Sequence, residues 1–190
     1  VAVGESPITG VDTMAAFELS GVAAAARERG CPLIDMDIRE PVDVAIPGGL
    51  AIKSLKLCPE ILEFDLIVSM PVMKTHMHTV ATLSVKNMKG CLWRRSKFAL
   101  HMLPPVEGMD DKPIDIAIAD MSAVIRPHLA IIDGSTCMEG LGPGAGTPKK
   151  MDVAVVGADP FAADAVACAL MGLKAEDVPH LRIAASRGCG

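Results

Sequence analysis

Short apolar runs alternate along the chain with segments whose apolar residues recur at helical spacing. Runs rich in Val, Ile and Leu predict strands, and apolar residues three and four apart predict helices. The predicted strands cover residues 1–4, 33–37, 42–46, 50–57, 65–70, 128–132 and 151–156. The predicted helices cover residues 13–28, 59–63, 79–88, 93–103, 113–125, 161–171 and 179–187. Asp12 and Asp159 stand where helix caps are expected, and Gly30 and Gly172 stand where helices end.

This alternation predicts an α/β fold with a largely parallel sheet flanked by helices. One antiparallel hairpin is expected, because Pro47, Gly48 and Gly49 form a turn between two of the strands. Residues 136–150 are rich in glycine and proline and predict a long loop, either a flexible lid or a backbone cradle for phosphate. No linker divides the chain, so residues 1–190 are expected to form a single domain. The lack of an initial methionine indicates a fragment of a longer chain.

The composition narrows the class of protein. No apolar run approaches the roughly 20 residues that a membrane span needs, and the N-terminus has no signal-peptide pattern. The six cysteines are scattered without a C-x-x-C pair, so we expect this segment to ligate neither zinc nor an iron–sulfur cluster. Reduced thiols, a cytoplasmic location and no membrane partner are the expectation.

The charge is unevenly distributed along the chain. The protein has 18 Lys and Arg against 23 Asp and Glu, a net charge of −5. Residues 71–106, here called the basic segment, nevertheless contain no Asp or Glu. They hold three of the five histidines and six cations: Lys74, Lys86, Lys89, Arg94, Arg95 and Lys97. The segment is either an anion site or a solvated face that pairs with acidic neighbours. Nucleic acid is not an expected partner, since stacking aromatics are nearly absent.

Polar side chains follow three predicted strands. The basic segment follows the strand at 65–70, Asp133 and Glu139 follow the strand at 128–132, and Asp159 and Asp164 follow the strand at 151–156. The carboxyl ends of parallel strands meet at one edge of a sheet, where ligands bind. We therefore expect the cations to face these carboxylates. Two alternatives stay open: Asp159 as a helix cap, and Asp133 with Gly134 as a turn.

Residue types within the basic segment suggest roles. A lysine beside a buried strand end must find an anion or shift its pKa, so Lys74 and Lys86 are candidate anion ligands. His76 can act as a hydrogen-bond donor or a general acid–base near neutral pH, and Asn87 can bond in either sense. His76 and His78 share a face of an extended segment and could hold a metal together. No clear third ligand accompanies them, so the metal is left unassigned.

A specific motif spans residues 65–90: D-x-I-V-S-M-P-x-x-K-T-H-x-x-x-x-x-T-x-x-x-K-N-x-x-G. Shorter motifs include Gly4-Glu5-Ser6-Pro7, Met138-Glu139-Gly140 and Gly157-Ala-Asp159-Pro. In this order they resemble the family catalogued as domain of unknown function 362. The resemblance implies that these residues form the site: Lys74, Thr75, His76, Thr82, Lys86, Asn87, His101, Asp133, Glu139, Asp159 and Asp164. Many members also carry a ferredoxin-like four-iron, four-sulfur segment, which implies a redox-linked reaction and an iron–sulfur domain or redox partner.

A more distant resemblance is to nickel-pincer lactate racemases, in which histidines act as acid–base groups and a lysine carries the cofactor. His76 lies ten residues before Lys86, which suits such a pair. The glycine-rich context expected around that lysine is replaced by Leu83-Ser-Val-Lys86-Asn.

The leading hypothesis is a redox-linked enzyme domain that binds an anionic small molecule or cofactor at the strand ends. Lys74 and Lys86 would hold the anion, and His76 with His101 would move protons. The alternative is a non-catalytic docking or electron-transfer module, which an exposed apolar patch near Trp93 and Phe98 without a pocket would favour. A purely structural polar cluster would leave no cavity beside the lysines.

Overall fold

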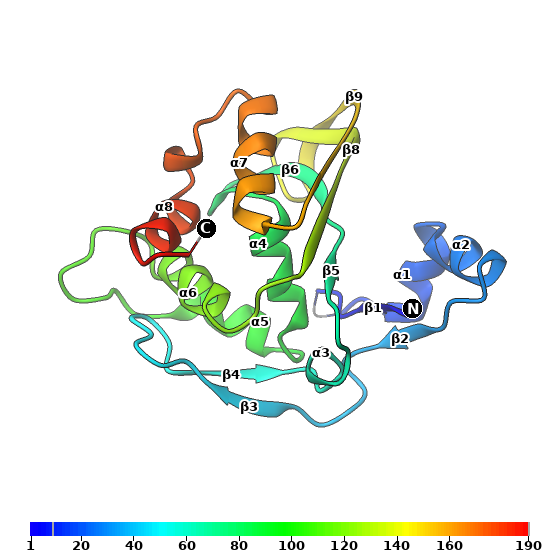
Figure 1. Cartoon of the computed structure of the whole chain (residues 1–190), viewed down its shortest axis with the longest axis horizontal. Coiled ribbons are helices and arrows are strands. Elements are labelled where there is room, and N and C mark those ends of the chain that lie inside the picture. Colours follow the sequence, from blue (N-terminus) through cyan, green and yellow to red (C-terminus); the bar gives the residue numbers. More distant parts are fainter. Residues whose placement is uncertain (9, 190) are drawn as a thin grey trace.

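The centre of the molecule is a mixed sheet in which one long strand has neighbours on both edges. The computed structural model describes residues 1–8 and 10–189 (Figure 1). In the sheet, β8 (Leu129–Leu141) pairs with β9 (Ala145–Gly157) on one edge. Its other edge pairs with β5 (Val68–Ser69) and then β6 (Val72–His76), which in turn pairs with β7 (Val80–Thr82). β5 and β6 run parallel to β8, whereas β9 and the β6–β7 pair are antiparallel. The α/β class is confirmed, and the largely parallel sheet is corrected to a mixed one.

The sheet is mixed because the segment predicted to be a loop forms parts of two antiparallel strands instead. Residues 136–150 form the outer halves of β8 and β9, with Thr136 opposite Lys150 and Leu141 opposite Ala145. The glycines here permit close backbone approach. A Cβ on Gly146 would lie 2.5 Å from the carbonyl oxygen of Glu139, and one on Gly142 would lie 2.0 Å from that of Thr75. The prediction of a long loop is therefore wrong for these residues, which form a hairpin whose tip residue Pro143 lines the cavity described below.

The most apolar helices pack around the central sheet. α7 (Pro160–Leu170) follows β9 and is capped by Asp159, as its sequence predicts. α6 (Pro113–Ser122) is buried along almost its whole length and packs against α8 (Pro179–Ser186). Between them and the sheet lies α4 (Ser84–Asn87), a single turn that continues as the 3-10 helix η1 (Met88–Cys91). This arrangement places α4 in the middle of the core.

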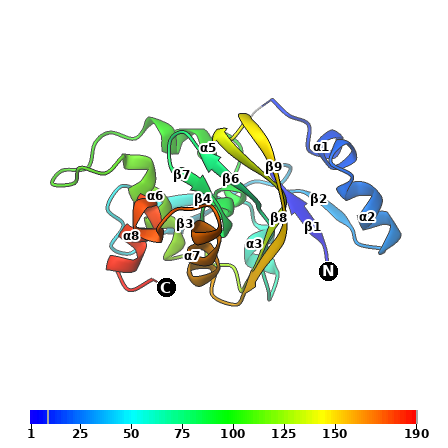
Figure 2. The same cartoon turned by 90° about the horizontal axis from the view of Figure 1, so that it is seen from above.

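The N-terminal unit lies to one side of the main body, opposite α6 and α8 (Figures 1 and 2). It contains the parallel pair β1 (Val3–Glu5) and β2 (Leu33–Asp35), joined through α1 (Thr13–Leu19) and α2 (Val22–Glu28). One helix over 13–28 was expected. It is broken after Leu19 because Gly21 has φ +79°, a left-handed conformation that interrupts a helix.

The remaining short elements divide into confirmed and corrected predictions. The antiparallel hairpin of β3 (Val42–Ala45) and β4 (Ser54–Leu57) is confirmed, as is the helical turn α3 (Glu60–Glu63). The basic segment contains two strands that were not predicted, β6 and β7. Its second predicted helix is reduced to α5 (Ser96–Ala99) and the 3-10 helix η2 (Leu100–Met102), and a further 3-10 helix, η3 (Ala175–Asp177), precedes α8. The buried strand expected at 65–70 keeps only two paired residues, with exposed side chains on both sides of Ser69.

Within the described residues, no helix has the length and apolar character needed to cross a membrane.

Candidate functional site

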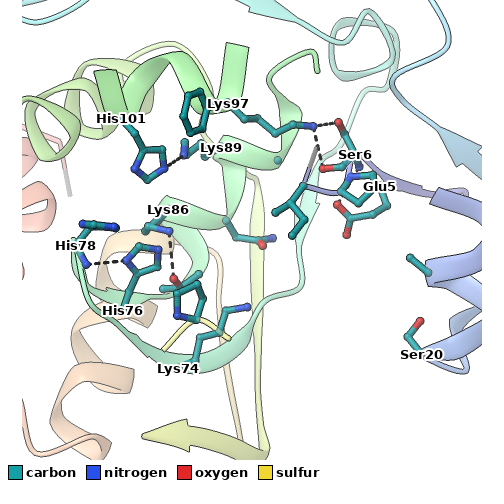
Figure 3. A pocket seen from close by; sticks show the side chains of 18 of the residues that line it. Glu5, Ser6, Ser20, Lys74, His76, His78, Lys86, Lys89, Lys97 and His101 are labelled. Atoms are coloured by element: carbon teal, nitrogen blue, oxygen red, sulfur yellow. Dashed lines mark hydrogen bonds between the residues drawn. The ribbon is translucent and has the colours of Figure 1, made fainter. Parts of the chain in front are cut away.

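A cavity of about 1180 Å³ lies between the N-terminal unit and the basic segment. Its lining includes five of the six cations of that segment, Lys74, Lys86, Lys89, Arg95 and Lys97, and the histidines at 76, 78 and 101. Among the described residues, Glu5 is the one carboxylate in the lining. Figure 3 shows the labelled cations and histidines converging on this space, with Glu5, Ser6 and Ser20 on the N-terminal side. The basic segment therefore folds around one cavity.

Strand alternation places two of the predicted residues. Successive side chains of β6 point to opposite faces, so Lys74 and His76 face the cavity and Thr75 faces away. The Thr75 hydroxyl donates to the carbonyl oxygen of Gly140 at 2.9 Å and so ties β6 to the β8–β9 hairpin. Within the part of the chain that the structure describes, Lys74 has no hydrogen-bond or ion-pair partner. Its charge is available to a ligand.

The turn α4 carries Lys86 and Asn87 into the cavity wall, beside Thr82 at the end of β7. Asp164 on α7 holds this turn in place, because its carboxylate accepts hydrogen bonds from the backbone N–H groups of Ser84 (2.7 Å) and Val85 (2.9 Å). Burial raises the pKa of Asp164 to about 7, and the two backbone donors oppose that rise. Asp164 therefore stabilises the turn α4, which carries Lys86, from outside the cavity.

Lys86 is a buried amine with few partners. Its side chain is 8% exposed, and its Nζ donates to the Thr82 hydroxyl at 3.2 Å. No carboxylate of the described residues lies within 4 Å of the Nζ. Burial, followed by the charges of Lys89 and Lys74, lowers the pKa of Lys86 to about 7, while Asp115 on α6 opposes the change. Near neutral pH this amine is divided between its charged and neutral forms.

Two of the cavity histidines, His76 and His101, have lowered pKa values, and a backbone hydrogen bond defines the tautomer of His76. The Nδ1 of His76 accepts from the backbone N–H of His78 at 3.1 Å, so the ring proton resides on Nε2. Burial, followed by the charge of Lys86, lowers the pKa of His76 to about 3. The Nε2 of His101 lies 2.7 Å from the Nζ of Lys89. Burial, followed by the charge of Lys89, lowers the pKa of His101 to about 4, and burial lowers that of Lys89 to about 8.

The N-terminal unit supplies a different wall. Lys97 reaches it by donating to the carbonyl oxygen of Ser6 at 3.0 Å and to the Ser6 hydroxyl, and it lies 3.5 Å from Asp37. Lys97 is thus a compensated cation that joins α5 to the strand β1. Besides the polar residues Glu5, Ser6 and Ser20, this wall is apolar and is formed by Pro7, Ile8, Ala16, Phe17 and Val22. One side of the cavity is cationic and the other is largely apolar.

The carboxylates expected opposite the cations lie elsewhere. β9 is antiparallel to β8, so its carboxyl end lies beside Ala130 at the amino end of β8. Asp159 there caps α7 and pairs with Arg126 at 2.7 Å. Asp133 accepts from the backbone of Ser135, which lowers its pKa, and Glu139 pairs with Lys149 across the hairpin at 2.8 Å. None of these three side chains lines the cavity. The expectation that three strand ends converge is wrong.

Six of the predicted site residues meet at the cavity: Lys74, His76, Thr82, Lys86, Asn87 and His101. The others are Thr75, Asp133, Glu139, Asp159 and Asp164, which lie outside its lining. No site role was predicted for Lys89, Arg95 or Lys97. The absence of Asp and Glu from the whole basic segment is the sequence signal that could have identified them as site residues. No sequence signal marks the residues of the apolar wall. In the described residues no three His, Cys, Asp or Glu side chains are grouped to hold a metal ion.

Fold and site together define an α/β protein whose basic segment encloses a cationic cavity with one apolar wall. The chain belongs to the family described as Domain of unknown function (DUF362), whose model matches residues 1–169. It is similar to Thylakoid-associated protein sll1697 of Synechocystis sp., with 30% identity over 127 residues, 67% of this chain and 39% of that protein. The chain thus spans about two fifths of the length of this relative. No solved structure matches it.

Proposed function

We propose that this chain is an enzyme domain that binds an anionic small molecule or cofactor in the cationic cavity. Lys74, Lys89 and Arg95 attract the anion, and Lys86 and His76 act on the part of the ligand that lies against them. The supporting observation is the lack of counter-charge. Five cations line the cavity with one carboxylate, and Lys97 alone among the five is ion-paired within the described residues. Of the four unpaired cations, Lys86 is buried, Lys74 and Lys89 are half-buried, and Arg95 is exposed. A buried cation normally has a partner, and a bound anion would supply one to Lys86.

The groups around the cavity also suit proton transfer. The amines of Lys86 and Lys89, with pKa values of about 7 and about 8, can exchange protons near neutral pH. His76 and His101 are neutral, so they serve as hydrogen-bond donors and acceptors. Perturbed pKa values that cluster in a cavity favour a functional site over a structural one.

We further propose that the reaction is redox-linked and takes place in the cytoplasm, with an iron–sulfur domain or redox partner supplying electrons. All six cysteines are free thiols, which agrees with a reducing compartment, and none is grouped with others as cluster ligands.

A docking or electron-transfer module is the second candidate, because Phe98 is 61% exposed at the cavity mouth. A docking patch would need no cationic cavity beside it, whereas Phe98 borders one. The presence of the cavity therefore favours the enzyme.

Native and denaturing mass spectrometry of freshly purified protein, with metal analysis of the same sample, tests the proposal. A mass that is retained under native conditions, lost on denaturation and absent from Lys86→Met identifies the ligand class. The matched control is Lys150→Met, which removes an exposed lysine outside the cavity. Citrate and inorganic phosphate are then titrated into the stripped protein. Failure of both to bind, with no retained mass, would favour the docking module, and a covalent group on Lys86 in the purified protein would favour a racemase-like nickel cofactor.

A further inference from the structure

The position of Lys86 indicates a role beyond charge attraction. The cavity has other amines for that purpose, since Lys74 and Lys89 are more exposed than Lys86. Lys86 is set deeper, on a helical turn fixed from below by Asp164, and a hydroxyl is its one hydrogen-bond partner within residues 1–8 and 10–189. An amine that serves only as a counter-ion is normally paired or well exposed to solvent, whereas Lys86 has no ion-pair partner in the described residues and is 8% exposed.

Two of the charged neighbours of Lys86 disfavour its charged form, and a third favours it. Lys74 lies on β6, Lys89 on η1, and both disfavour a third positive charge between them. Asp115 on α6 acts the other way, but it is buried against His180 at 3.3 Å, behind the cavity wall. A desolvated lysine next to other cations is a recognised way to keep an amine neutral and nucleophilic at physiological pH.

We infer that Lys86 is a nucleophile that forms an imine with an anionic aldehyde, ketone or 2-oxo acid bound in the cavity. This inference rests on the proposed function, because the cations must first hold the anionic group of the carbonyl compound. The neutral amine nitrogen attacks the carbonyl carbon and gives a carbinolamine. The carbon–oxygen bond then breaks, the two amine hydrogens leave with the oxygen as one water molecule, and a carbon–nitrogen double bond remains. No oxidant or reductant is consumed.

The surroundings fit this reaction. His76 carries its proton on Nε2 and lines the same wall, so it can donate a hydrogen bond to the oxygen that develops negative charge during the attack. Lys74 and Lys89 can bind the anionic group of the substrate. The apolar wall formed by Phe17 and its neighbours can hold a hydrocarbon or aromatic body. The ligand class is thus a carbonyl compound with an anionic group and an apolar part.

Two probes that differ at one group test the inference. Pyridoxal 5′-phosphate has an aldehyde, and pyridoxine 5′-phosphate has an alcohol in its place, so the second binds without forming an imine. Equimolar pyridoxal 5′-phosphate is added at pH 7.5, and borohydride then reduces any imine to a stable secondary amine. The modified lysine is located by peptide mapping. We expect labelling of Lys86 at least roughly ten-fold faster than of exposed Lys150, because burial among cations lowers the pKa of Lys86 to about 7 and leaves much of its amine neutral at this pH.

The outcomes separate the inference from the proposed function. Labelling confined to Lys86, absent in Lys86→Arg and blocked by excess pyridoxine 5′-phosphate, supports both. Binding of pyridoxine 5′-phosphate without a reducible adduct on Lys86 overturns the inference and leaves the proposed function intact. Preferential labelling of Lys74 or Lys89 also overturns it. If neither probe binds, both the proposed anion-binding cavity and the imine are overturned. Mapping locates the adduct in the native sequence, so the outcomes that overturn the inference do not depend on whether Lys86→Arg folds.

Discussion

Lys86 combines burial with a cationic neighbourhood, and this combination makes protein stability depend on pH. In the unfolded chain a lysine has a pKa of about 10.4, whereas in the folded protein the pKa of Lys86 is lowered to about 7. Between these two values the unfolded chain binds a proton that the folded protein has released. Stability therefore rises with pH across that window and is lost as pH falls towards 7.

Replacing Lys86 with methionine should remove the part of this dependence that Lys86 contributes, while Lys89, whose pKa is lowered to about 8, keeps a smaller part at higher pH. The free energy of unfolding of the native protein should rise by a few kcal/mol between about pH 7 and pH 10, on the scale of about 1.4 kcal/mol per pKa unit. Lys86→Met should show a flatter profile and should be the more stable protein at pH 6, because it buries no charge. Urea unfolding at several pH values measures both. Lys150→Met, on the exposed hairpin, should keep the native dependence of stability on pH. If all three proteins showed the same dependence, the pKa of Lys86 would not be lowered by burial in the folded protein.

At the scale of elements, the turn α4 depends on a carboxylate from α7. Asp164→Ala would leave the buried N–H groups of Ser84 and Val85 without acceptors. We expect the free energy of unfolding to fall by about 2–4 kcal/mol, since each buried donor left unsatisfied costs about 1–3 kcal/mol. Affinity for anions should fall as well, because Lys86 lies on this turn.

Asp159→Ala is the matched control for that experiment. It removes a carboxylate from the same end of α7, where Asp159 caps the helix and pairs with the exposed Arg126. Loss of a helix cap costs about 1 kcal/mol, and an exposed ion pair adds little. Urea unfolding and citrate titration of both variants should separate them. Equal losses of stability, or unchanged anion affinity in Asp164→Ala, would show that α4 does not depend on this clamp.

The tip of the β8–β9 hairpin offers a second comparison between neighbouring positions. Gly142 packs against β6, where an added Cβ would meet the Thr75 carbonyl oxygen at 2.0 Å, whereas a Cβ on Gly144 would have nothing within 4 Å. Gly142→Ala should therefore destabilise the protein by about 1–3 kcal/mol, and Gly144→Ala should change stability by less than about 0.5 kcal/mol. Thermal unfolding measures the difference. Equal melting temperatures would mean that the hairpin tip does not rest on β6.

The same hairpin shows why part of the fold could not be predicted from the sequence. Residues 136–150 are mostly exposed, so no apolar alternation marks them as strands, and their glycines serve close backbone approach. Helix α6 and the cap Asp159 were predictable because burial and capping leave local signatures. The break at Gly21 was not, since a glycine between alanine-rich turns is compatible with either one helix or two. Because β9 returns antiparallel to β8, Asp159 lies away from the cations. This direction follows from the hairpin, which no sequence pattern indicates.

At the scale of the whole molecule, net charge is a poor guide to the site. The protein carries −5 overall, yet five of its 18 cations border one cavity. Salt screens charges beyond about 8 Å at physiological ionic strength, so an anion inside the cavity interacts mainly with the nearby lysines. The uneven distribution of charge along the chain predicted this concentration. The apolar wall on the N-terminal unit could not be predicted, because it is brought to the cavity by tertiary packing.

The charge balance of the folded protein predicts that anion binding is coupled to proton uptake. At pH 8 the amine of Lys86 is mostly neutral and that of Lys89 is about half charged, given pKa values of about 7 and about 8. An anion beside them favours their charged forms and raises both pKa values. Each binding event should then take up as much as about one proton at pH 8 and almost none at pH 6, where both amines are already charged.

Calorimetric titration of sulfate measures this uptake, in HEPES and Tris at pH 8 and in MES and Bis-Tris at pH 6, because the two buffers of each pair release protons with different enthalpies and sulfate itself does not titrate in this range. The binding enthalpy should differ between the buffers at pH 8 and agree at pH 6, and affinity should fall as pH rises from 7 to 9. Lys86→Met should reduce the difference at pH 8, whereas Lys150→Met should leave it unchanged. Equal enthalpies in both buffers at pH 8, with sulfate bound, would show that the anion binds away from these two lysines.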